Sequence, residues 1–319
     1  MSQADENPQG PNPQGPTPGL VAQDLVKVFP GAKGQEVRAV DGVSFKAFFG
    51  EVYGLLGVNG AGKTTVLRML STMLTPTSGE AKVCGFDVQR NPKEVRARIG
   101  FMSTATSLYG RLTAREMVTY FGRLNGMKEE AIDKRVDELF GLFDMKEFGG
   151  RRCDKLSTGM KQKVSIVRTV LHDPDVLVFD EPTAGLDVLT SRTIVDFVRD
   201  CRERGKCVIF STHIMDEVEK LCDRVGVIHE GKLWADEPLE SLQDRAPSRR
   251  VEEAFVSLVE GSFEEVPEKE TVAEASEGGE TAEASEGGET AGASEGGETA
   301  EASEGGEKVP AGEAERGEP

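Results

Sequence analysis

The pattern of apolar and polar positions along the chain predicts an α/β fold. Residues Val176–Phe179 are apolar without interruption, which is typical of a strand buried on both faces in a parallel sheet. Further apolar stretches that predict strands are Val52–Leu56, Ile99–Met102 and Lys206–Phe210. Between strands, apolar residues recur at helical spacing, as at Val164, Val167 and Val170, and these runs predict helices.

Period-two alternation marks the N-terminal part and a later stretch of the chain. Val21–Phe29 and Val37–Phe45 alternate apolar with polar residues, and Pro30-Gly31 stands between them as a turn signal. A second such pair, Val225–His229 and Lys232–Ala235, flanks a Glu-Gly turn. We therefore expect short antiparallel strands near the N-terminus and a hairpin later in the chain.

A helical insert is predicted between two of the strands. Thr113 and Glu116 have the spacing of a capping box, in which each side chain satisfies a backbone amide at the start of a helix. Two runs of apolar residues at helical spacing follow, and they are most simply core. They are Met117, Tyr120, Phe121 and Leu124, then Ile132, Val136, Leu139, Phe140 and Phe143. The pattern predicts an all-helical subdomain of about residues 105–155.

Composition divides the 319-residue chain into three parts. Residues 1–19 are rich in Pro, Gly, Gln and Asn, and residues 262–319 repeat an acidic unit with a period of nine. This C-terminal segment has 18 Glu against three basic residues, so it carries 15 of the 18 net negative charges. We expect a disordered leader at 1–19, a folded domain at 20–261 and a disordered acidic tail at 262–319.

Several features bear on compartment and partners. The chain has no run of about 18 apolar residues, and its N-terminus lacks the basic start and apolar core of a secretory signal. Its five cysteines show no metal-binding spacing, and their odd number suits reduced thiols. Because the part before the tail is close to neutral and shows no basic face, we expect no nucleic-acid partner. These features predict a cytoplasmic protein that does not cross a membrane by itself.

The segment Gly57–Thr64 carries the clearest chemical motif. It fits G-x-x-x-x-G-K-[ST] at every position, follows a strand and opens a helix predicted at Thr65–Leu74. A chance Gly-rich segment is the alternative, and the strand–loop–helix order argues against it. In such a loop, backbone amides surround the phosphates, Lys63 reaches the outer phosphates and the Thr64 hydroxyl binds Mg²⁺. The predicted phosphate-binding residues here are Gly57, Asn59, Gly60, Ala61, Gly62, Lys63, Thr64 and Thr65.

Two acidic residues follow the apolar run Val176–Phe179. Asp180 and Glu181 stand at the carboxyl end of the predicted strand, where open α/β sheets bind ligands. Taken alone, the pair is equally compatible with a solvated acidic turn. Together with the phosphate loop, it predicts that Asp180 holds Mg²⁺ and that Glu181 polarises the water that attacks the outer phosphate.

The order of the motifs resembles that of ABC transporter ATPase subunits. After the phosphate loop come the turn Ser157–Gly159 at a helix start, Asp180-Glu181, Ala184–Asp187 and, after a further strand, Thr212-His213. The resemblance covers about residues 20–261. It implies a P-loop NTPase (RecA-like) fold, α/β, with a parallel sheet core, an N-terminal antiparallel β subdomain and an inserted α-helical subdomain. LSTGMKQK and FSTHIMDEVEKLCDRVGVIHEGK further resemble the ATPase subunits of sodium-extruding ABC exporters.

The resemblance also implies roles for further residues. Phe29 matches the aromatic residue that stacks on adenine, and His213 matches a residue that contacts the γ-phosphate and senses its loss. Ser157, Gly159 and Asp187 belong to the nucleotide-binding set, and in the family the Ser-x-Gly turn presses against ATP held by the other subunit. The implied assembly is a homodimer of ATP-binding subunits. In the family, a groove of the helical subdomain receives a helix of an integral membrane permease, so the resemblance implies such a partner here.

The chain departs from the family pattern at two places. Thr104 stands where the family has a glutamine that touches both Mg²⁺ and the attacking water, and a threonine does not reach as far. Thr158 and Met160 replace the usual Gly and Gln of the signature turn, and slower turnover is the expected result.

The sequence thus predicts a subunit that binds and hydrolyses ATP and powers export across the cytoplasmic membrane. Glu181, His213 and Lys63 are its predicted catalytic residues, and Thr64 and Asp180 are the predicted Mg²⁺ ligands. Sodium ions are the predicted cargo, with a drug or another small molecule as the alternative. A second alternative is a nucleotide-gated regulatory clamp with weak hydrolysis. We expect the protein on the inner face of the cell membrane, held there by its permease partner.

Overall fold

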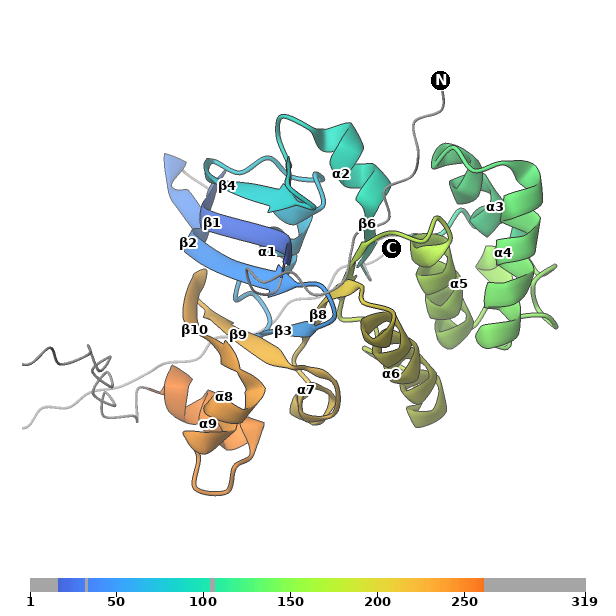
Figure 1. Ribbon diagram of the computed structural model, residues 1–319. Coiled ribbons are helices and arrows are strands. Elements are labelled where there is room, and N and C mark those ends of the chain that lie inside the picture. The colour runs from blue at the N-terminus through green and yellow to red at the C-terminus, as the bar shows by residue number, and fades with distance from the viewer. Residues whose placement is uncertain (1–16, 32–33, 104–106, 261–319) are drawn as a thin grey trace, which may run out of the picture. The chain divides into compact units, whose positions relative to one another are not determined.

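The computed structural model describes residues 17–31, 34–103 and 107–260 (Figure 1). The predicted acidic tail, most of the predicted leader and Thr104 lie outside these residues. Within them, the chain forms an antiparallel sheet, a second and mostly parallel sheet, and helices that connect the strands.

The antiparallel sheet has the strand order β2-β1-β4-β5. Its strands are β1 (Pro18–Pro30), β2 (Glu36–Phe48), β4 (Ser78–Val83) and β5 (Phe86–Asp87). β1 and β2 pair antiparallel, as their alternating sequences predict. β1 begins two residues before the domain start expected at Leu20, because Pro18 already pairs with Phe48 and Cys84 N donates a hydrogen bond to Gly19 O.

The second sheet has the strand order β10-β9-β3-β8-β7-β6. Its strands are β3 (Val52–Leu56), β6 (Ile99–Ser103), β7 (Val176–Asp180), β8 (Cys207–Thr212), β9 (Arg224–His229) and β10 (Lys232–Pro238). All pairings are parallel except that of β10 with β9. All five residues of β7 are buried, which confirms the strand predicted from the uninterrupted apolar run.

The helices follow or connect the strands of the two sheets. They are α1 (Lys63–Leu70), α2 (Pro92–Arg98), α3 (Ala114–Leu124), α4 (Glu129–Leu142), α5 (Thr158–Val170), α6 (Val188–Glu203), α7 (Met215–Leu221), α8 (Leu239–Asp244) and α9 (Val251–Val259). The helix predicted at Thr65–Leu74 is wrong at both ends, since α1 begins and ends earlier. Its end is early because Thr72 has a left-handed φ of 62°, which a helix does not continue through.

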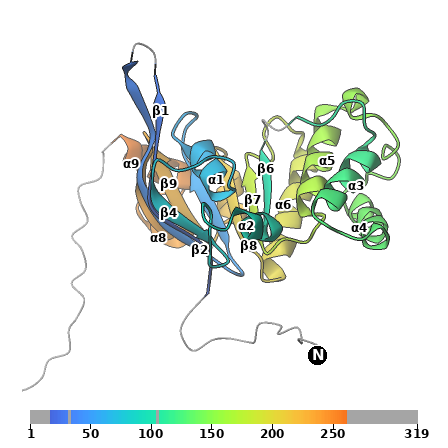
Figure 2. The same cartoon turned by 90° about the horizontal axis from the view of Figure 1, so that it is seen from above.

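Two helices, α3 and α4, lie within the insert predicted between β6 and α5. α3 begins with the predicted capping box: Glu116 N donates to Thr113 Oγ1 (3.2 Å), and Thr113 N donates to Glu116 Oε2 (2.8 Å). A 3₁₀ turn at Cys153–Lys155 precedes α5. Figures 1 and 2 both show α3, α4 and α5 side by side, and the three helices contact one another.

The second sheet separates two hydrophobic clusters. Phe179 and Phe210 belong to the cluster that contains the buried side chains of α3–α7 and α9. Val178 and Ile209 belong to the cluster that contains those of α1 and the antiparallel sheet. Neighbouring residues of one strand enter different clusters because successive side chains point to opposite faces of a sheet.

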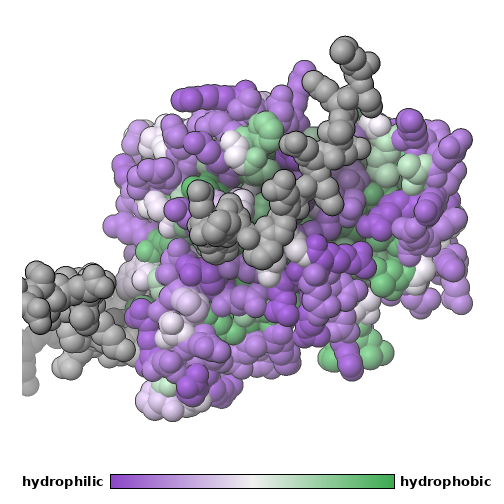
Figure 3. All heavy atoms as spheres, viewed as in Figure 1, coloured by the Kyte–Doolittle hydropathy of each residue, from purple (hydrophilic) through white to green (hydrophobic). Residues whose placement is uncertain are grey.

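The face of the described part shown in Figure 3 is largely hydrophilic, with smaller hydrophobic areas between the polar ones. Among the large apolar side chains that the structure describes, Val188 and Leu189 at the start of α6 are the most exposed, at 82% and 77%. No helix in residues 17–31, 34–103 and 107–260 has the length and apolar character that a membrane span requires.

Candidate active site

The phosphate loop lies between β3 and α1, and two of its glycines are required for different reasons. Gly62 precedes α1 with a φ of 111°, which residues with a side chain rarely adopt. Gly57 packs against β9, where an added Cβ would stand 2.4 Å from Ile228 O. The loop is thus fixed both by its own backbone conformation and by its contact with the neighbouring strand.

A cavity of about 220 Å³ opens over this loop. It is lined by Ala39, Val58, Asn59, Gly60, Gly62, Lys63, Thr64, Thr65 and Glu181. Most of the loop residues predicted to bind ATP are among them. Ala61 is instead buried beneath the loop, at 3% exposure, so its side chain supports the loop from inside.

Lys63 extends into the loop and is only 4% exposed. Its Nζ donates hydrogen bonds to Gly57 O (2.6 Å) and Val58 O (3.3 Å), and it lies 3.4 Å from Glu181 Oε1. Such partners are needed because a charged ammonium group loses its hydration when it is buried. Phosphate oxygens are charged acceptors for the same group, so Lys63 is placed to bind them.

Asp180 is the centre of a cluster of hydroxyl groups at the ends of three strands. Its carboxylate is 3% exposed. It accepts hydrogen bonds from Thr64 Oγ1 (3.0 Å to Oδ2), Ser103 Oγ (3.2 Å) and Ser211 Oγ (2.9 Å). The sequence reading missed Ser103 and Ser211. The signal for both is the parallel register, which pairs Asp180 with Ser103 on β6 and with Ser211 on β8.

Thr64 and Asp180 fit the requirements of Mg²⁺. The ion prefers hard oxygen donors and is commonly held by one or two carboxylates together with substrate phosphates. A hydroxyl and a carboxylate are in contact here, next to the loop that would hold the phosphates. Among the described residues there is no group of three or more His, Cys, Asp or Glu side chains that would hold a metal without a substrate.

Glu181 and His213 lie beside Lys63. Glu181 follows β7 with a left-handed φ of 51°, and its backbone amide donates a hydrogen bond to Ser211 O (3.1 Å). Its Oε1 lies 3.4 Å from Lys63 Nζ and also 3.4 Å from His213 Nδ1. The structure therefore brings together the three side chains that the sequence predicted to be catalytic.

Ser157, Gly159 and Asp187 form a separate group. Ser157 caps α5 by accepting a hydrogen bond from Met160 N (3.3 Å). Asp187 caps α6, where hydrogen bonds from the backbone amide and the hydroxyl of Thr190 lower the pKa of Asp187. Gly159 faces Asp187 and Thr190. None of the three predicted binding residues lines the cavity over the phosphate loop.

Phe29 also lies outside that cavity. It pairs with Val37 near the end of the β1–β2 hairpin, and Lys27 Nζ lies 5.2 Å from the centre of its ring. The ring is partly exposed. Its role in binding adenine remains a prediction.

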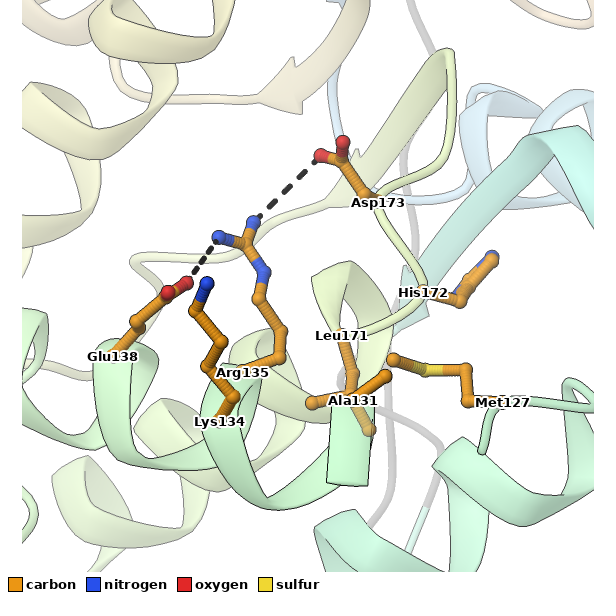
Figure 4. Close-up of a pocket in the computed structure, with 8 residues that line it drawn as sticks. All are labelled: Met127, Ala131, Lys134, Arg135, Glu138, Leu171, His172 and Asp173. Carbon is orange, nitrogen blue, oxygen red and sulfur yellow. Dashed lines mark hydrogen bonds and ion pairs between the residues drawn. The ribbon is translucent and has the colours of Figure 1, made fainter. Parts of the chain in front are cut away.

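Another cavity, of about 310 Å³, lies between α4 and the end of α5 (Figure 4). It is lined by Met127, Ala131, Lys134, Arg135, Glu138, Leu171, His172 and Asp173. Arg135 forms ion pairs with both Glu138 (3.1 Å) and Asp173 (3.6 Å), so its charge is already balanced. Lys134 also lines the cavity, but no glycine does, so this cavity lacks the loop amides of a phosphate-binding site, although it is the larger of the two.

The fold and the site define a P-loop ATPase. The sequence profile of the ABC transporter family matches residues 40–184. The chain is 44% identical over 231 residues to the ABC transporter ATP-binding protein NatA of Bacillus subtilis (strain 168), a match that covers 72% of this chain and 94% of that protein. The chain therefore belongs to the ABC transporter family, as the order of its motifs predicted. It is an ATPase of the kind that hydrolyses ATP to power transport.

Two further similarities agree with this assignment. The probable multidrug ABC transporter ATP-binding protein YbhF of Escherichia coli (strain K12) is 36% identical over 245 residues, covering 75% of this chain and 41% of YbhF. A solved ATP-binding subunit of an ABC transporter is 28% identical with a TM-score of 0.68, covering 75% of this chain and 99% of that one. The predicted fold class is thereby confirmed.

Proposed function

We propose that this chain powers an exporter and that Glu181 activates the water that attacks the γ-phosphate of ATP. The observation that carries the proposal is the position of Glu181 Oε1, 3.4 Å from Lys63 Nζ and 3.4 Å from His213 Nδ1. Among the described residues, Glu181 is the one acidic side chain that lines the cavity over the phosphate loop. A general base must lie within reach of the proton that it takes, and the position of Glu181 at the edge of this cavity supports that role.

Phosphate binding gives Lys63 a new partner. The oxygens of the γ-phosphate bind its ammonium group and the loop amides, so the ion pair between Lys63 and Glu181 is released. Glu181 then accepts a proton from water while the water oxygen bonds to the γ-phosphorus and the bond to the bridging oxygen of ADP breaks. His213, whose Nδ1 lies 3.4 Å from the same Glu181 oxygen, holds Glu181 and the γ-phosphate in one arrangement.

Thr64 and Asp180 are the residues that would hold Mg²⁺. When bound, the ion neutralises the negative charge of the β- and γ-phosphate oxygens. Ser103 and Ser211 keep the Asp180 carboxylate oriented through their hydroxyl groups, because each donates to one of its two oxygens.

We also place Ser157, Gly159 and Asp187 at the contact with a second copy of the chain. These residues lie at the starts of α5 and α6 and do not line the loop cavity of their own chain. Twofold symmetry would carry each Ser157 turn to the ATP of the other copy. Val188 and Leu189 follow Asp187 and offer exposed apolar area to the same contact.

The cargo that we propose is sodium, exported by a separate membrane permease on whose inner face the chain is docked. The support is the resemblance of the stretches around Ser157 and His213 to the ATPase subunits of sodium-extruding exporters. The name of YbhF points instead to drugs, which remain the alternative.

A transport assay tests the proposed cargo. Inverted vesicles that contain the chain and its permease should take up sodium when ATP is added. Uptake of a drug without sodium would reject this cargo.

Replacement of Glu181 tests the catalytic assignment. We expect Glu181→Gln to bind ATP and to form the ATP-dependent dimer, but to hydrolyse ATP at least about a hundredfold more slowly, on the scale of general-base catalysis. Steady-state phosphate release measures hydrolysis, and size-exclusion chromatography with ATP measures formation of the ATP-dependent dimer. Glu203→Gln, which removes the same charge at the end of α6, is the matched control. Normal turnover of Glu181→Gln would remove Glu181 from this role.

A further inference from the structure

The carboxylate of Glu217 joins two segments that carry predicted catalytic residues. Its Oε2 accepts a hydrogen bond from Thr183 Oγ1 (2.9 Å) and a second from Thr212 Oγ1 (2.9 Å). Thr183 lies two residues after Glu181, and Thr212 immediately precedes His213. One oxygen atom therefore ties the loop after β7 to the end of β8.

These hydrogen bonds have a defined direction. Ile214 N donates to Thr212 Oγ1 (3.0 Å), which leaves the hydroxyl hydrogen of Thr212 for Glu217. Thr183 and Thr212 are 3% and 2% exposed, and buried hydroxyl groups need partners. A carboxylate oxygen gives them stronger hydrogen bonds than a neutral acceptor would. The three side chains thus act as one unit.

Helix α7 holds Glu217 in place. Val218 and Leu221 of this helix are 0% and 3% exposed and belong to the same core cluster as Phe179 and Phe210. Gln162 Nε2 of α5 also donates a hydrogen bond to Pro182 O (2.5 Å). The loop that begins at Glu181 is therefore held by hydrogen bonds to two helices.

The position of Glu181 depends on such support. Its left-handed φ of 51° is unfavourable for a residue with a side chain and persists only where the surroundings impose it. The hydrogen bond between Ser211 and the Glu181 amide fixes one end of this segment. The hydrogen bond between Thr183 and Glu217 fixes the same segment two residues further along the chain.

We propose that Glu217 is a positioning residue that couples Glu181 to His213. It keeps the loop that carries Glu181 and the segment that carries His213 in register, so that both side chains face the γ-phosphate together. Because the same loop continues to Asp187, movement of that loop when two copies close would reach His213 through Glu217. The inference rests on the proposed role of Glu181 in ATP hydrolysis.

Steady-state hydrolysis by the full chain tests the coupling. We expect Glu217→Ala to lower kcat by about tenfold or more, the effect of losing charge-assisted hydrogen bonds, while ATP affinity changes by less than about twofold. Glu217→Gln keeps an acceptor oxygen and should recover most of the activity. Glu219→Ala is the matched control, because Glu219 lies on the same helix but accepts its hydrogen bond from Val251 N of α9. Its kcat should stay near that of the wild type.

The same replacement made in a His213→Ala variant distinguishes coupling from a merely structural role. If Glu217 acts through His213, Glu217→Ala should slow His213→Ala by much less than it slows the wild type. Thr183→Val and Thr212→Val should each lower kcat in the same way, which keeps the test open if Glu217→Ala fails to fold. An equal loss in both backgrounds would overturn the coupling. An unchanged kcat of Glu217→Ala, or of both threonine variants if Glu217→Ala fails to fold, would overturn it as well.

The outcomes also distinguish this inference from the function on which it rests. A wild-type chain that hydrolyses ATP, together with a Glu217→Ala variant of equal kcat, rejects the coupling alone. A wild-type chain that binds Mg²⁺-ATP without hydrolysing it, or a fully active Glu181→Gln variant, rejects the proposed function and the coupling with it.

Discussion

Replacement of Gly57 by alanine tests whether the close packing of the phosphate loop against β9 sets the affinity for ATP. The new Cβ would stand 2.4 Å from Ile228 O and 2.9 Å from Ile228 Cγ2. Since non-bonded carbon atoms in contact stay about 3.5 Å apart, the loop or the strand must move by roughly 1 Å. The nearest atom is a backbone carbonyl oxygen, which cannot move away by a change of side-chain rotamer.

The magnitude follows from two separate costs. Overpacking of this kind destabilises a protein by about 1–3 kcal/mol, and the backbone obstacle at Gly57 favours the upper end of that range. Misplacement of binding groups by about 1 Å can cost roughly a hundredfold in function. Gly126→Ala separates packing from backbone strain, because Gly126 has a φ of 74° but nothing within 4 Å of an added Cβ. Its expected cost is about 1 kcal/mol in stability, with no change in ATP affinity.

Urea unfolding and ATP titration measure these two effects. We expect Gly57→Ala to lose about 3 kcal/mol of unfolding free energy and about a hundredfold in ATP affinity. If Gly57→Ala binds ATP as tightly as Gly126→Ala, the contact with Ile228 does not hold the loop in its binding conformation.

The remaining predictions concern the start of α6 and the acidic tail. Because hydrogen bonds from Thr190 lower the pKa of Asp187 from its usual 3.8, the stabilisation by Asp187 is full above that value and is lost as the pH falls through the lowered pKa. The difference in melting temperature between wild type and Asp187→Ala should therefore shrink as the pH falls below about 3.8, and a constant difference would contradict the assignment. Truncation after Gly261 should leave ATP turnover within about twofold, as a surface change would, whereas a tenfold loss would give the tail a part in catalysis.

Signals of short range were reliable guides to this structure. The start of α3 depends on Thr113 and Glu116, three residues apart, and their reciprocal hydrogen bonds are present. The phosphate loop and the strand β7 were likewise read from single continuous stretches. The end of α1 was missed because it depends on the backbone conformation of Thr72, which no pattern of apolar residues records.

Contacts of long range in the sequence were the ones that escaped prediction. Ser103 and Ser211 reach Asp180 only because β6, β7 and β8 align their carboxyl ends. Glu217 meets Thr183 across 34 residues of sequence, through the placement of α7 beside the sheet. Such contacts depend on register and packing angle, whereas the motif order that identified Glu181 and His213 is a property of the sequence itself.

The division of the core by the second sheet has a consequence for how proteins of this architecture diversify. Side chains of α3–α5 belong to one cluster, and those of α1 and the antiparallel sheet belong to the other. Substitutions in the insert can therefore be accommodated on one side of the sheet while the packing beneath the nucleotide loop is preserved on the other. Proteins of this architecture can in this way acquire substitutions in the insert that suit new membrane proteins and keep the same ATP-hydrolysing site.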